Sequence, residues 1–528
     1  MKIAPILRTA GAALLYALVI YHCFFTGLAR MGFTGPDEPR YASIARDMAS
    51  SGDWVTPRLN GTPWFEKPPL YYWSAAIGFR LFARAERAAR APSGVFALCA
   101  VLGIALLAMR CYGPATARAV AWMLPATVGM TGFARAAATD MPFAACLALA
   151  MCAAAILALE ESPRHRAAWA AGFGAALGLA VLAKGPAAIL LAGGSTALWA
   201  LATGNVRRSF RLLDPWAIVS FLVVALPWYV LCAVRNPEFL RIFLLEHNVE
   251  RFLTNRYQHH QPFWFFAPIL LLAVFPWTLL LLPALGDAWR NFRGGNWRQY
   301  PSAYFAAWVI FPFVFFSASQ SKLPGYILPG VPPLVLLLAR ALARDEPATA
   351  SVARSRLLWV AAALVAGGFV VLLRPAAALT PAAAEQPLAL AGIALAGGGG
   401  LVAAAGAWRG LRRSAAAAAI VVSVAAGLVA NHVLPSLDRE VSARPLAMQS
   451  AGLSSGMQTY HLARAWQYGL DFYLRGPVPE WTPGTSPPPW IITDDVGRGQ
   501  LMGMGWRLDP KQPGSARATL FRVKDAPR

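Results

Sequence analysis

Two acidic residues open the first polar segment of the chain, Asp37 and Glu38 in GPDEPRYASIARDM. After them, four residues recur at the spacing of one helix face: Tyr41, Ile44, Ala45 and Met48. This pattern predicts a helix that lies at a membrane interface and begins at Asp37. A carboxylate beside a membrane span is a functional candidate because it is costly near hydrocarbon, but it can also cap the helix and favour its dipole. Spacing alone leaves both interpretations open.

The same segment continues into WVTPRLNGTPWFEKPPLYYW, which carries the charged pair Glu66-Lys67. Its aromatic residues are typical of the belt in which a protein meets lipid headgroups: Trp54, Trp64, Phe65, Tyr71, Tyr72 and Trp73. A lysine there can bind a lipid phosphate, and a glutamate there can bind a divalent cation. The alternative is a lysine that snorkels beside an exposed glutamate.

Short turns between apolar stretches carry further candidates. Asp140 follows FARAAAT, Lys184 in VLAKGPA is the only charge between two apolar stretches, and Lys322 and Tyr326 lie in SKLPGYILP. A second polar segment contains His247 and, four residues later, Arg251, which share a face if the segment is helical. A histidine there can ligate a metal and an arginine can hold a phosphate.

The composition restricts where these residues can act. Of 528 residues, 57% are hydrophobic and 14% are charged, whereas soluble domains average about 25% charged residues. This excludes an ordinary water-soluble enzyme. The formal net charge of +22 is compatible with nucleic-acid binding or with a membrane protein that has basic cytoplasmic loops. The charges lie between apolar stretches of regular spacing, so we expect an integral membrane protein and no nucleic-acid partner.

Thirteen stretches come close to the about 20 residues that cross a bilayer. They lie near 9–28, 92–109, 117–134, 141–159, 167–183, 185–204, 215–234, 263–284, 301–319, 325–339, 357–373, 387–408 and 414–433. We expect the first to be retained rather than cleaved as a signal peptide. Every second loop is basic and therefore predicted to be cytoplasmic. The apolar stretch 70–84 is interrupted by Arg80 and Arg84, and counting it as a span would invert all later loops. We interpret it as an interfacial helical piece on the outer side.

The chain therefore divides into a membrane bundle, 1–435, and a C-terminal domain, 436–528, on the outer face. Two polar outer loops, 30–91 and 235–262, interrupt the bundle. Short strands are predicted at WIITDD and ATLFRV, so the C-terminal domain is expected to be a small α/β unit. Its Asp494-Asp495 pair could bind a metal but is more simply a solvated turn. The six cysteines show no CxxC spacing, so neither a disulfide framework nor a zinc cluster is indicated.

All the candidates above lie on the outer side and include carboxylates, cations and aromatic rings. No glycine-rich phosphate loop and no Ser-His-Asp pattern accompanies them. Such a site suits a substrate with an anionic head and a long lipid tail. An enzyme that uses nucleoside triphosphates is not expected, because that pool is cytoplasmic.

These motifs resemble those of the bacterial aminoarabinose lipid A transferases, which belong to the protein-mannosyltransferase-like C-type glycosyltransferases. The resemblance extends over the whole bundle. It is carried by DEPRYA (37–42), WFEKPPLYYW (64–73), Thr139-Asp140, Lys184-Gly185, Glu246-His247, Arg251-Phe252, PFW (262–264) and SKLPGYILP (321–329).

The resemblance implies an all-α bundle of about thirteen spans with a small periplasmic α/β domain. It implies transfer of 4-amino-4-deoxy-L-arabinose from undecaprenyl phosphate to a phosphate of lipid A, at the periplasmic face of the bacterial inner membrane, by a monomer surrounded by membrane lipid. It assigns Asp37, Asp140 and Tyr326 to catalysis and Lys67, Arg251 and Arg40 to the donor phosphate. It places Lys184, Lys322 and Tyr41 in the substrate cavity, and Glu66 and His247 at a divalent metal, predicted to be zinc.

Two other functions remain open at this point. A related transferase could move another sugar, such as mannose, from a polyprenyl phosphate to a protein or another glycan. A flippase for lipid-linked sugars is the alternative from a different class. It is expected to need polar groups at the middle of the membrane and repeat symmetry, but, apart from Arg118 at the edge of 117–134, the predicted spans contain no Asp, Glu, Lys or Arg, and they show no matching halves.

Overall fold

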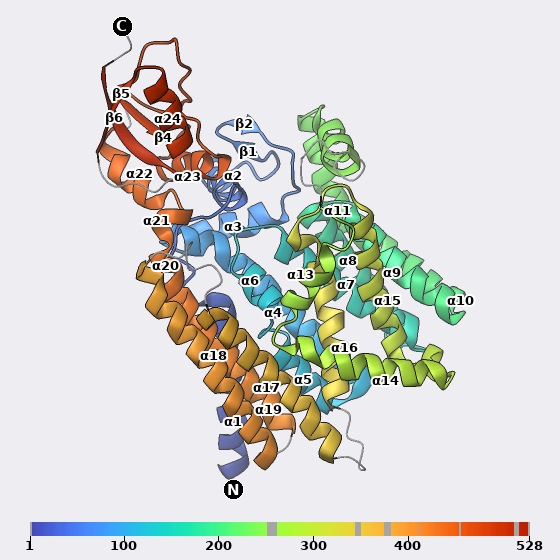
Figure 1. The fold of residues 1–528 in the computed structure, drawn as a ribbon. Helices are drawn as coiled ribbons and strands as arrows, with labels where there is room; N and C mark the ends of the chain where they lie inside the picture. Colours follow the sequence, from blue (N-terminus) through green and yellow to red (C-terminus); the bar gives the residue numbers. More distant parts are fainter. Residues whose placement is uncertain are drawn as a thin grey trace.

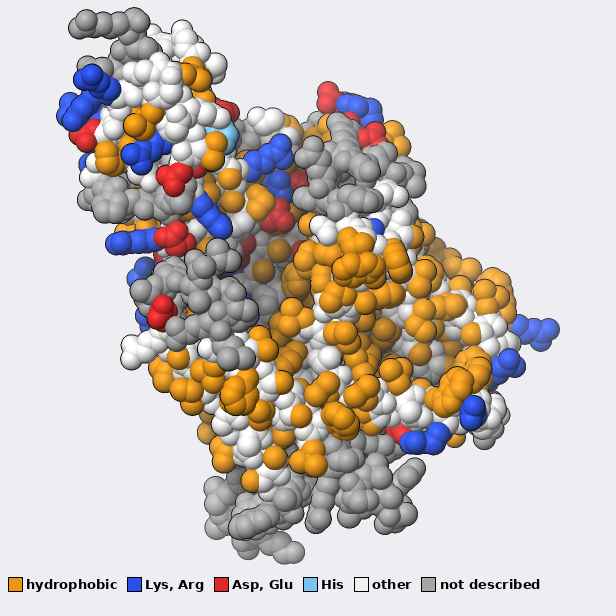
Figure 2. Space-filling model, in the orientation of Figure 1, with side chains coloured by type: hydrophobic (Ala, Val, Ile, Leu, Met, Phe, Trp, Pro, Cys, Tyr) orange, Lys and Arg blue, Asp and Glu red, His pale blue; other side chains and the backbone are white. Residues whose placement is uncertain are grey.

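The computed structural model describes residues 3–250, 261–343, 350–373, 382–409, 411–453, 456–511 and 517–525. Long helices lie side by side, and a small sheet domain covers one end of them (Figure 1). Hydrophobic side chains cover the middle of the bundle, whereas charged side chains gather in the hollow beside the sheet domain (Figure 2). This distribution is the one that a protein embedded in lipid requires.

Eight helical segments in the described part of the chain are long and apolar enough to cross a membrane. They are α4 (Ala85–Tyr112), α7 (Asp140–Leu159), α8 (Arg166–Lys184), α11 (Pro215–Arg235), α15 (Pro301–Ala318), η6 with α16 (Pro324–Ala343), and the segments Glu385–Ala404 and Ala415–Ser436. The last two segments belong to α18 (Ala382–Arg409) and to α19 (Leu411–Leu428) with its continuation η8 (Val429–Val433) and α20 (Leu434–Ser436). A multi-pass membrane protein is thereby confirmed.

The count of thirteen spans is not confirmed. A ninth candidate is a pair of helices bent by 106°, which has the geometry of a broken span or of a re-entrant loop. It consists of α13 (Phe266–Ala273) and the segment Trp277–Arg293, which contains η4 (Trp277–Leu280) and α14 (Leu281–Arg293). Three more predicted spans are shorter apolar helices, Gly11–Phe25, Ala187–Thr203 and Leu358–Leu372. They belong to α1 (Ile3–Ile20) with η1 (Tyr21–Phe25), to α9 (Ala187–Thr203) and to α17 (Ala350–Leu373). The predicted span 117–134 is broken into α5 (Pro114–Met123) and α6 (Val128–Ala134).

The first predicted outer loop is largely helical. It contains α2 (Asp37–Ser51), a hairpin of β1 (Arg58–Leu59) and β2 (Thr62–Pro63), α3 (Leu70–Leu81) and the first turns of α4, which begins before its predicted span. A 12-residue helix such as α3 is about 18 Å long, too short for a hydrocarbon core of about 30 Å. The predicted reading of 70–84 as a helical piece that does not span is confirmed. The second loop carries η3 (Arg241–Glu250).

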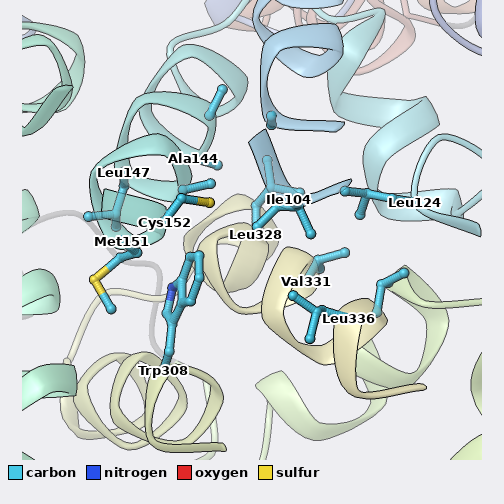
Figure 3. Packing of buried hydrophobic residues seen from close by; sticks show 14 of the residues in the cluster. Ile104, Leu124, Ala144, Leu147, Met151, Cys152, Trp308, Leu328, Val331 and Leu336 are labelled. Carbon is cyan, nitrogen blue, oxygen red and sulfur yellow. The ribbon is translucent and has the colours of Figure 1, made fainter. Parts of the chain in front are cut away.

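Helix α7 lies at the centre of the bundle, and most of its residues are buried. Its alanines let α4 and α8 approach closely, which is how helices associate in lipid. Leu147 and Met151 of α7 pack with Trp308 of α15 and with Leu328 and Val331 of η6 (Pro324–Gly330) and α16 (Val331–Ala343) (Figure 3). This core fixes the ends of α7, α8 and η6 relative to one another.

The remaining described elements of the bundle are short helices in its loops: α10 (Val206–Ser209), η2 (Phe210–Leu213) and η5 (Asn296–Gln299). The chain leaves α20 through α21 (Asp438–Val441), α22 (Arg444–Ser450) and η9 (Ala451–Leu453).

The C-terminal sheet has the strand order β3-β4-β6-β5. Its strands are β3 (Met457–Tyr460), β4 (Trp490–Thr493), β5 (Arg507–Pro510) and β6 (Thr519–Asp525), and its helices are α23 (Arg464–Tyr473) and α24 (Asp495–Gly503). Strands β3 and β4 are parallel, so a crossover must join them, and α23 lies in that connection. Both predicted strands are confirmed as β4 and β6. The expected solvated turn is the start of α24, where Asp494 Oδ1 accepts from Gly497 N at 2.7 Å. The division at residue 436 stays a prediction.

Candidate functional site

Helix α2 places an arginine between two carboxylates. It begins at Asp37, as the periodicity predicted, and ends at Gly52 in the left-handed conformation. Arg40 Nη2 lies 2.5 Å from Asp37 Oδ1 on the same helix and 3.0 Å from Glu66 Oε2. Lys67 Nζ lies 3.7 Å from Glu66 Oε1. Asp37, Arg40, Glu66 and Lys67 thus form one ion-pair cluster, which we call the α2 cluster.

Three aromatic rings surround the Arg40 guanidinium. Its Cζ lies 5.1 Å from the ring centre of Tyr41, 5.4 Å from that of Trp64 and 5.7 Å from that of Tyr468. Rings at these distances attract a cation. Tyr41 is buried against Tyr71 and Tyr72, so it supports Arg40 from behind. Tyr468 belongs to α23, and no motif in the sequence indicated that the C-terminal domain reaches this cluster.

The pKa of Asp37 is raised above its usual value. Enclosure by the protein is the main cause, the charges of Glu66 and Asp140 act in the same direction, and Arg40 and Lys67 oppose them. Its side chain nevertheless remains 47% exposed, so part of it stays accessible from outside the protein. The influence of Asp140 also indicates that the second charged cluster, described next, lies near the first.

Asp140, Lys184 and Tyr326 meet at the ends of three elements of the bundle. Asp140 is the first residue of α7 and Lys184 the last of α8, and Lys184 Nζ lies 2.6 Å from Asp140 Oδ1. The same ammonium lies 4.7 Å from the ring centre of Tyr326 in η6. A Cβ on the neighbouring Gly325 would lie 2.4 Å from Asp140 Oδ1, so only glycine fits there without displacement. We call this group the α7 cluster.

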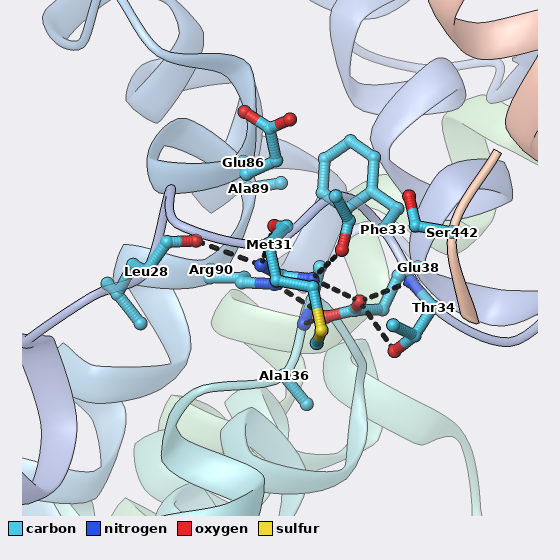
Figure 4. Close-up of polar contacts among 12 residues, drawn as sticks. Leu28, Met31, Phe33, Thr34, Glu38, Glu86, Ala89, Arg90, Ala136 and Ser442 are labelled. Atoms are coloured by element: carbon cyan, nitrogen blue, oxygen red, sulfur yellow. Dashed lines mark hydrogen bonds and ion pairs between the residues drawn. The ribbon is translucent and has the colours of Figure 1, made fainter. Parts of the chain in front are cut away.

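Glu38 and Arg90 tie α2 to α4 (Figure 4). Arg90 Nη2 lies 2.6 Å from Glu38 Oε2, and Arg90 also donates to the carbonyl oxygens of Leu28, Met31 and Gly32. Burial alone would raise the pKa of Glu38, but the charge and hydrogen bonds of Arg90 and the backbone donors hold it below its usual value. Sequence reasoning missed Arg90, because an arginine near the start of a span is commonly an interfacial anchor.

Of the remaining predicted residues, Lys322 and His247 lie in the described chain and Arg251 lies outside it. Lys322 is buried, and its Nζ donates to the carbonyl oxygens of Ser319 at 2.6 Å and Gln261 at 3.0 Å. It therefore fixes the turn between α15 and η6. His247 lies in η3, and Phe239, just before η3, packs on Phe65 with ring centres 5.4 Å apart.

Glu66 and His247 are the residues predicted to bind a metal ion. Within the described ranges, no group of three or more His, Cys, Asp or Glu residues is arranged to hold a metal. Both oxygens of Glu66 lie within ion-pair distance of cations, Arg40 and Lys67, with which a metal would compete. The described residues therefore do not form a metal site by themselves, and the assignment of Glu66 and His247 stays a prediction.

The chain is similar to several known proteins. Residues 66–231 match the family described as dolichyl-phosphate-mannose-protein mannosyltransferase. Two curated relatives are undecaprenyl phosphate-α-4-amino-4-deoxy-L-arabinose arabinosyl transferases. The one from Edwardsiella ictaluri is 33% identical over 58% of this chain and 54% of its own length. The one from Pseudomonas aeruginosa is 34% identical over 63% and 60%. The chain thus spans less than two thirds of the length of these relatives.

A solved structure extends the similarity to the whole chain. The ArnT of Cupriavidus metallidurans bound to undecaprenyl phosphate is 27% identical, with a TM-score of 0.81 over 97% of this chain and 98% of that one. Its apo form is 26% identical, with a TM-score of 0.80. Together with the motifs, these similarities support the aminoarabinose transferase family within the protein-mannosyltransferase-like C-type glycosyltransferases as the family that this chain resembles.

Proposed function

We propose that this protein transfers 4-amino-4-deoxy-L-arabinose from undecaprenyl phosphate to a phosphate of lipid A. The observation that carries the proposal is the α2 cluster, in which two carboxylates and two cations lie together outside the spans. The similarity over 97% of the chain to a protein bound to undecaprenyl phosphate supports the same donor. The curated relatives, named as arabinosyl transferases, support the sugar.

The cations of the α2 cluster suit the leaving group. In the transfer, the bond from the sugar's anomeric carbon to the donor phosphate oxygen breaks and a bond to an acceptor phosphate oxygen forms. The departing undecaprenyl phosphate gains negative charge, which fixed cations stabilise best when they need not move. Arg40 and Lys67 are these cations in the described chain, and Arg251 is assigned the same task from the family motif.

Asp37 has a different task when the acceptor is a phosphate. A phosphate is already an anion and needs no general base, whereas a hydroxyl acceptor would. Asp37 Oδ1 faces Arg40, which leaves Oδ2 for the substrate. We assign to Asp37 the stabilisation of positive charge on the sugar, either its ammonium or the anomeric carbon as the donor bond breaks. We assign Asp140 and Tyr326 to the substrate cavity from the family motif, and we infer that Lys184, which contacts both residues, keeps Asp140 in place.

The reaction is assigned to the periplasmic face of the bacterial inner membrane, with the protein acting as a monomer in membrane lipid. The basic loops of the sequence support this orientation. Zinc at Glu66 and His247 is tested by elemental analysis of the purified protein. A metal content near zero in fully active protein would remove the metal from the proposal.

Mass spectrometry of lipid A tests the function. Deletion of the gene should remove the mass increment of aminoarabinose, the wild-type gene should restore it, and Asp37→Asn should not. Asp47→Asn, on the same helix α2 outside the cluster, is the matched control and should restore it. Lipid A that is unchanged by the deletion would refute the proposal.

Two further outcomes would identify the alternatives. Loss of sugar from a protein, with lipid A intact, would favour the protein-mannosyltransferase activity named by the family that matches 66–231. An assay of product formation by purified protein in detergent distinguishes a transferase from a flippase, because only a transferase makes product without a membrane. Absence of product from donor and lipid A, in folded protein, would favour the flippase.

A further inference from the structure

We propose that the C-terminal domain is part of the donor site, with Tyr468 of α23 as a positioning residue that holds Arg40 against Asp37 and Glu66. The inference rests on the proposed function for its substrate and on the geometry of α23 for its content. It gives the C-terminal domain a role that its own sequence does not suggest.

Helix α23 packs directly on α2 (Figure 1). Arg46 of α2 donates from Nη1 to the carbonyl oxygen of Phe472 at 2.7 Å, and its guanidinium lies 4.3 Å from the centre of the Phe472 ring. The Phe472 ring is buried, with the Phe33 ring centre 4.9 Å away. The C-terminal end of α23 is therefore inserted into the apolar cluster beneath α2.

Polar contacts with three other segments fix the same end of α23. The Tyr473 hydroxyl accepts from Phe33 N at 2.9 Å and donates to Glu86 of α4 at 3.0 Å. Asp471 accepts from Asn60, in the turn between β1 and β2, at 3.3 Å. Because α23 is attached to α2, to α4 and to the hairpin, its remaining side chains have a defined position relative to the α2 cluster.

Tyr468 lies one turn before Phe472, on the same face of α23. This spacing brings the centre of the Tyr468 ring to 5.7 Å from Arg40 Cζ. The same guanidinium forms ion pairs with Asp37 and Glu66. Tyr41 and Trp64 complete the surround. An arginine side chain has many rotamers, and a ring that contacts its guanidinium restricts them. Tyr468 thereby keeps Arg40 aimed at the place of the donor phosphate.

A purely structural role for the domain predicts a different result. If Tyr468 only supported folding, its substitution would lower the yield or thermal stability of the protein and leave the kinetic constants of the folded fraction unchanged. A positioning role predicts folded protein with altered constants. The ring matters in this role, not the hydroxyl, so Tyr468→Phe should behave as wild type.

The experiment uses the purified full-length protein in detergent and measures transfer rate against donor concentration. Tyr468→Leu should raise KM for the donor about tenfold and lower kcat, within the range of one desolvated cation–π contact, with thermal stability unchanged. Tyr468→Phe should stay within about twofold. The control is Tyr460→Leu, on β3, where the tyrosine contacts Gln500 and Trp481 rather than the α2 cluster.

Binding of undecaprenyl phosphate provides a second measurement that does not depend on the sugar or the acceptor. Weaker binding by Tyr468→Leu, but not by Tyr460→Leu, supports the proposal even when no aminoarabinose transfer is found, which would be a failure of the proposed function alone. If Tyr468→Leu transfers and binds like wild type, or if it matches Tyr460→Leu in every constant, the positioning role is wrong.

Discussion

Replacing Glu38 by alanine should cost about 4 kcal/mol of stability, within the 3–5 kcal/mol of a broken buried ion pair. Glu38 Oε1 accepts from Arg90 Nε at 2.9 Å and Ala137 N at 2.8 Å, and Oε2 accepts from Arg90 Nη2 at 2.6 Å and Thr34 N at 2.9 Å. The substitution leaves the 4% exposed Arg90 without this partner and Ala137 N without an acceptor. Glu86, whose charge also acts on Arg90, limits the loss.

The pH dependence has a definite sign. The pKa of Glu38 is lowered in the folded protein because Arg90 and the backbone donors outweigh burial. A lowered folded pKa contributes stability that is present above the unfolded pKa, about 4.3 for Glu, and that disappears as the pH falls through the folded value. The difference between wild type and Glu38→Ala should therefore be constant from pH 7 to about pH 5 and shrink only below about pH 4.

Thermal unfolding of the purified protein, followed by tryptophan fluorescence, measures this difference as apparent Tm at one scan rate. Asp47→Ala on α2 is the control and should change little. The double variant Glu38→Met/Arg90→Met should lose less stability than the sum of the losses in its two single variants. The reason is that each single variant leaves a buried charge without its partner, whereas the double variant removes both charges. A Glu38→Ala protein as stable as the Asp47→Ala protein, or additive losses in the double variant, would refute the reasoning.

Three further variants test the rest of the site. Gly325→Ala should lower transfer about tenfold in folded protein, because its Cβ would lie 2.4 Å from Asp140 Oδ1; a wild-type rate would contradict the close approach. Lys184→Met should lower kcat and Lys184→Arg should retain most of it, since the ion pair to Asp140 needs a cation; equal rates for the two variants would contradict this role. Asp494→Ala removes the cap of α24 and its bond to Gly497 N, so it should cost about 1 kcal/mol in the C-terminal domain and leave transfer intact, which thermal unfolding and rate assays check.

Local sequence patterns predicted helices and strands well where the burial of apolar residues determines the structure of the element. The periodicity after Asp37 predicted α2, and the short apolar runs predicted β4 and β6. The number of spans was harder, because hydropathy does not reveal a break inside an apolar run. The stretch 117–134 is interrupted at Pro125 and resumes where Thr127 accepts from Met130 N at the start of α6. A proline followed by a capping threonine was the available signal.

The pairing of the charged residues could not be predicted in the same way. Family motifs pointed to Asp37, Asp140 and Lys184 individually, but which cation contacts which carboxylate depends on how distant segments pack. Lys322 illustrates the problem: a lysine in a family motif is buried here on two carbonyl oxygens. The contact between Arg40 and Tyr468 joins the two predicted domains, and no local pattern in either one encodes it.

The proposed substrate explains a feature that the two clusters share. A donor whose tail lies in the bilayer and whose phosphate lies in the site requires a site at a fixed height above the hydrocarbon. The α2 cluster lies on a helix and a loop that do not span, so it needs attachment to elements that do. Glu38 and Arg90 provide that attachment to α4, and the α7 cluster lies directly on the ends of α7 and α8. The C-terminal domain then restrains α2 from the opposite side through Arg46 and Phe472. In the proposed function, charges that are expensive to bury therefore both hold the donor and fix the place where it is held.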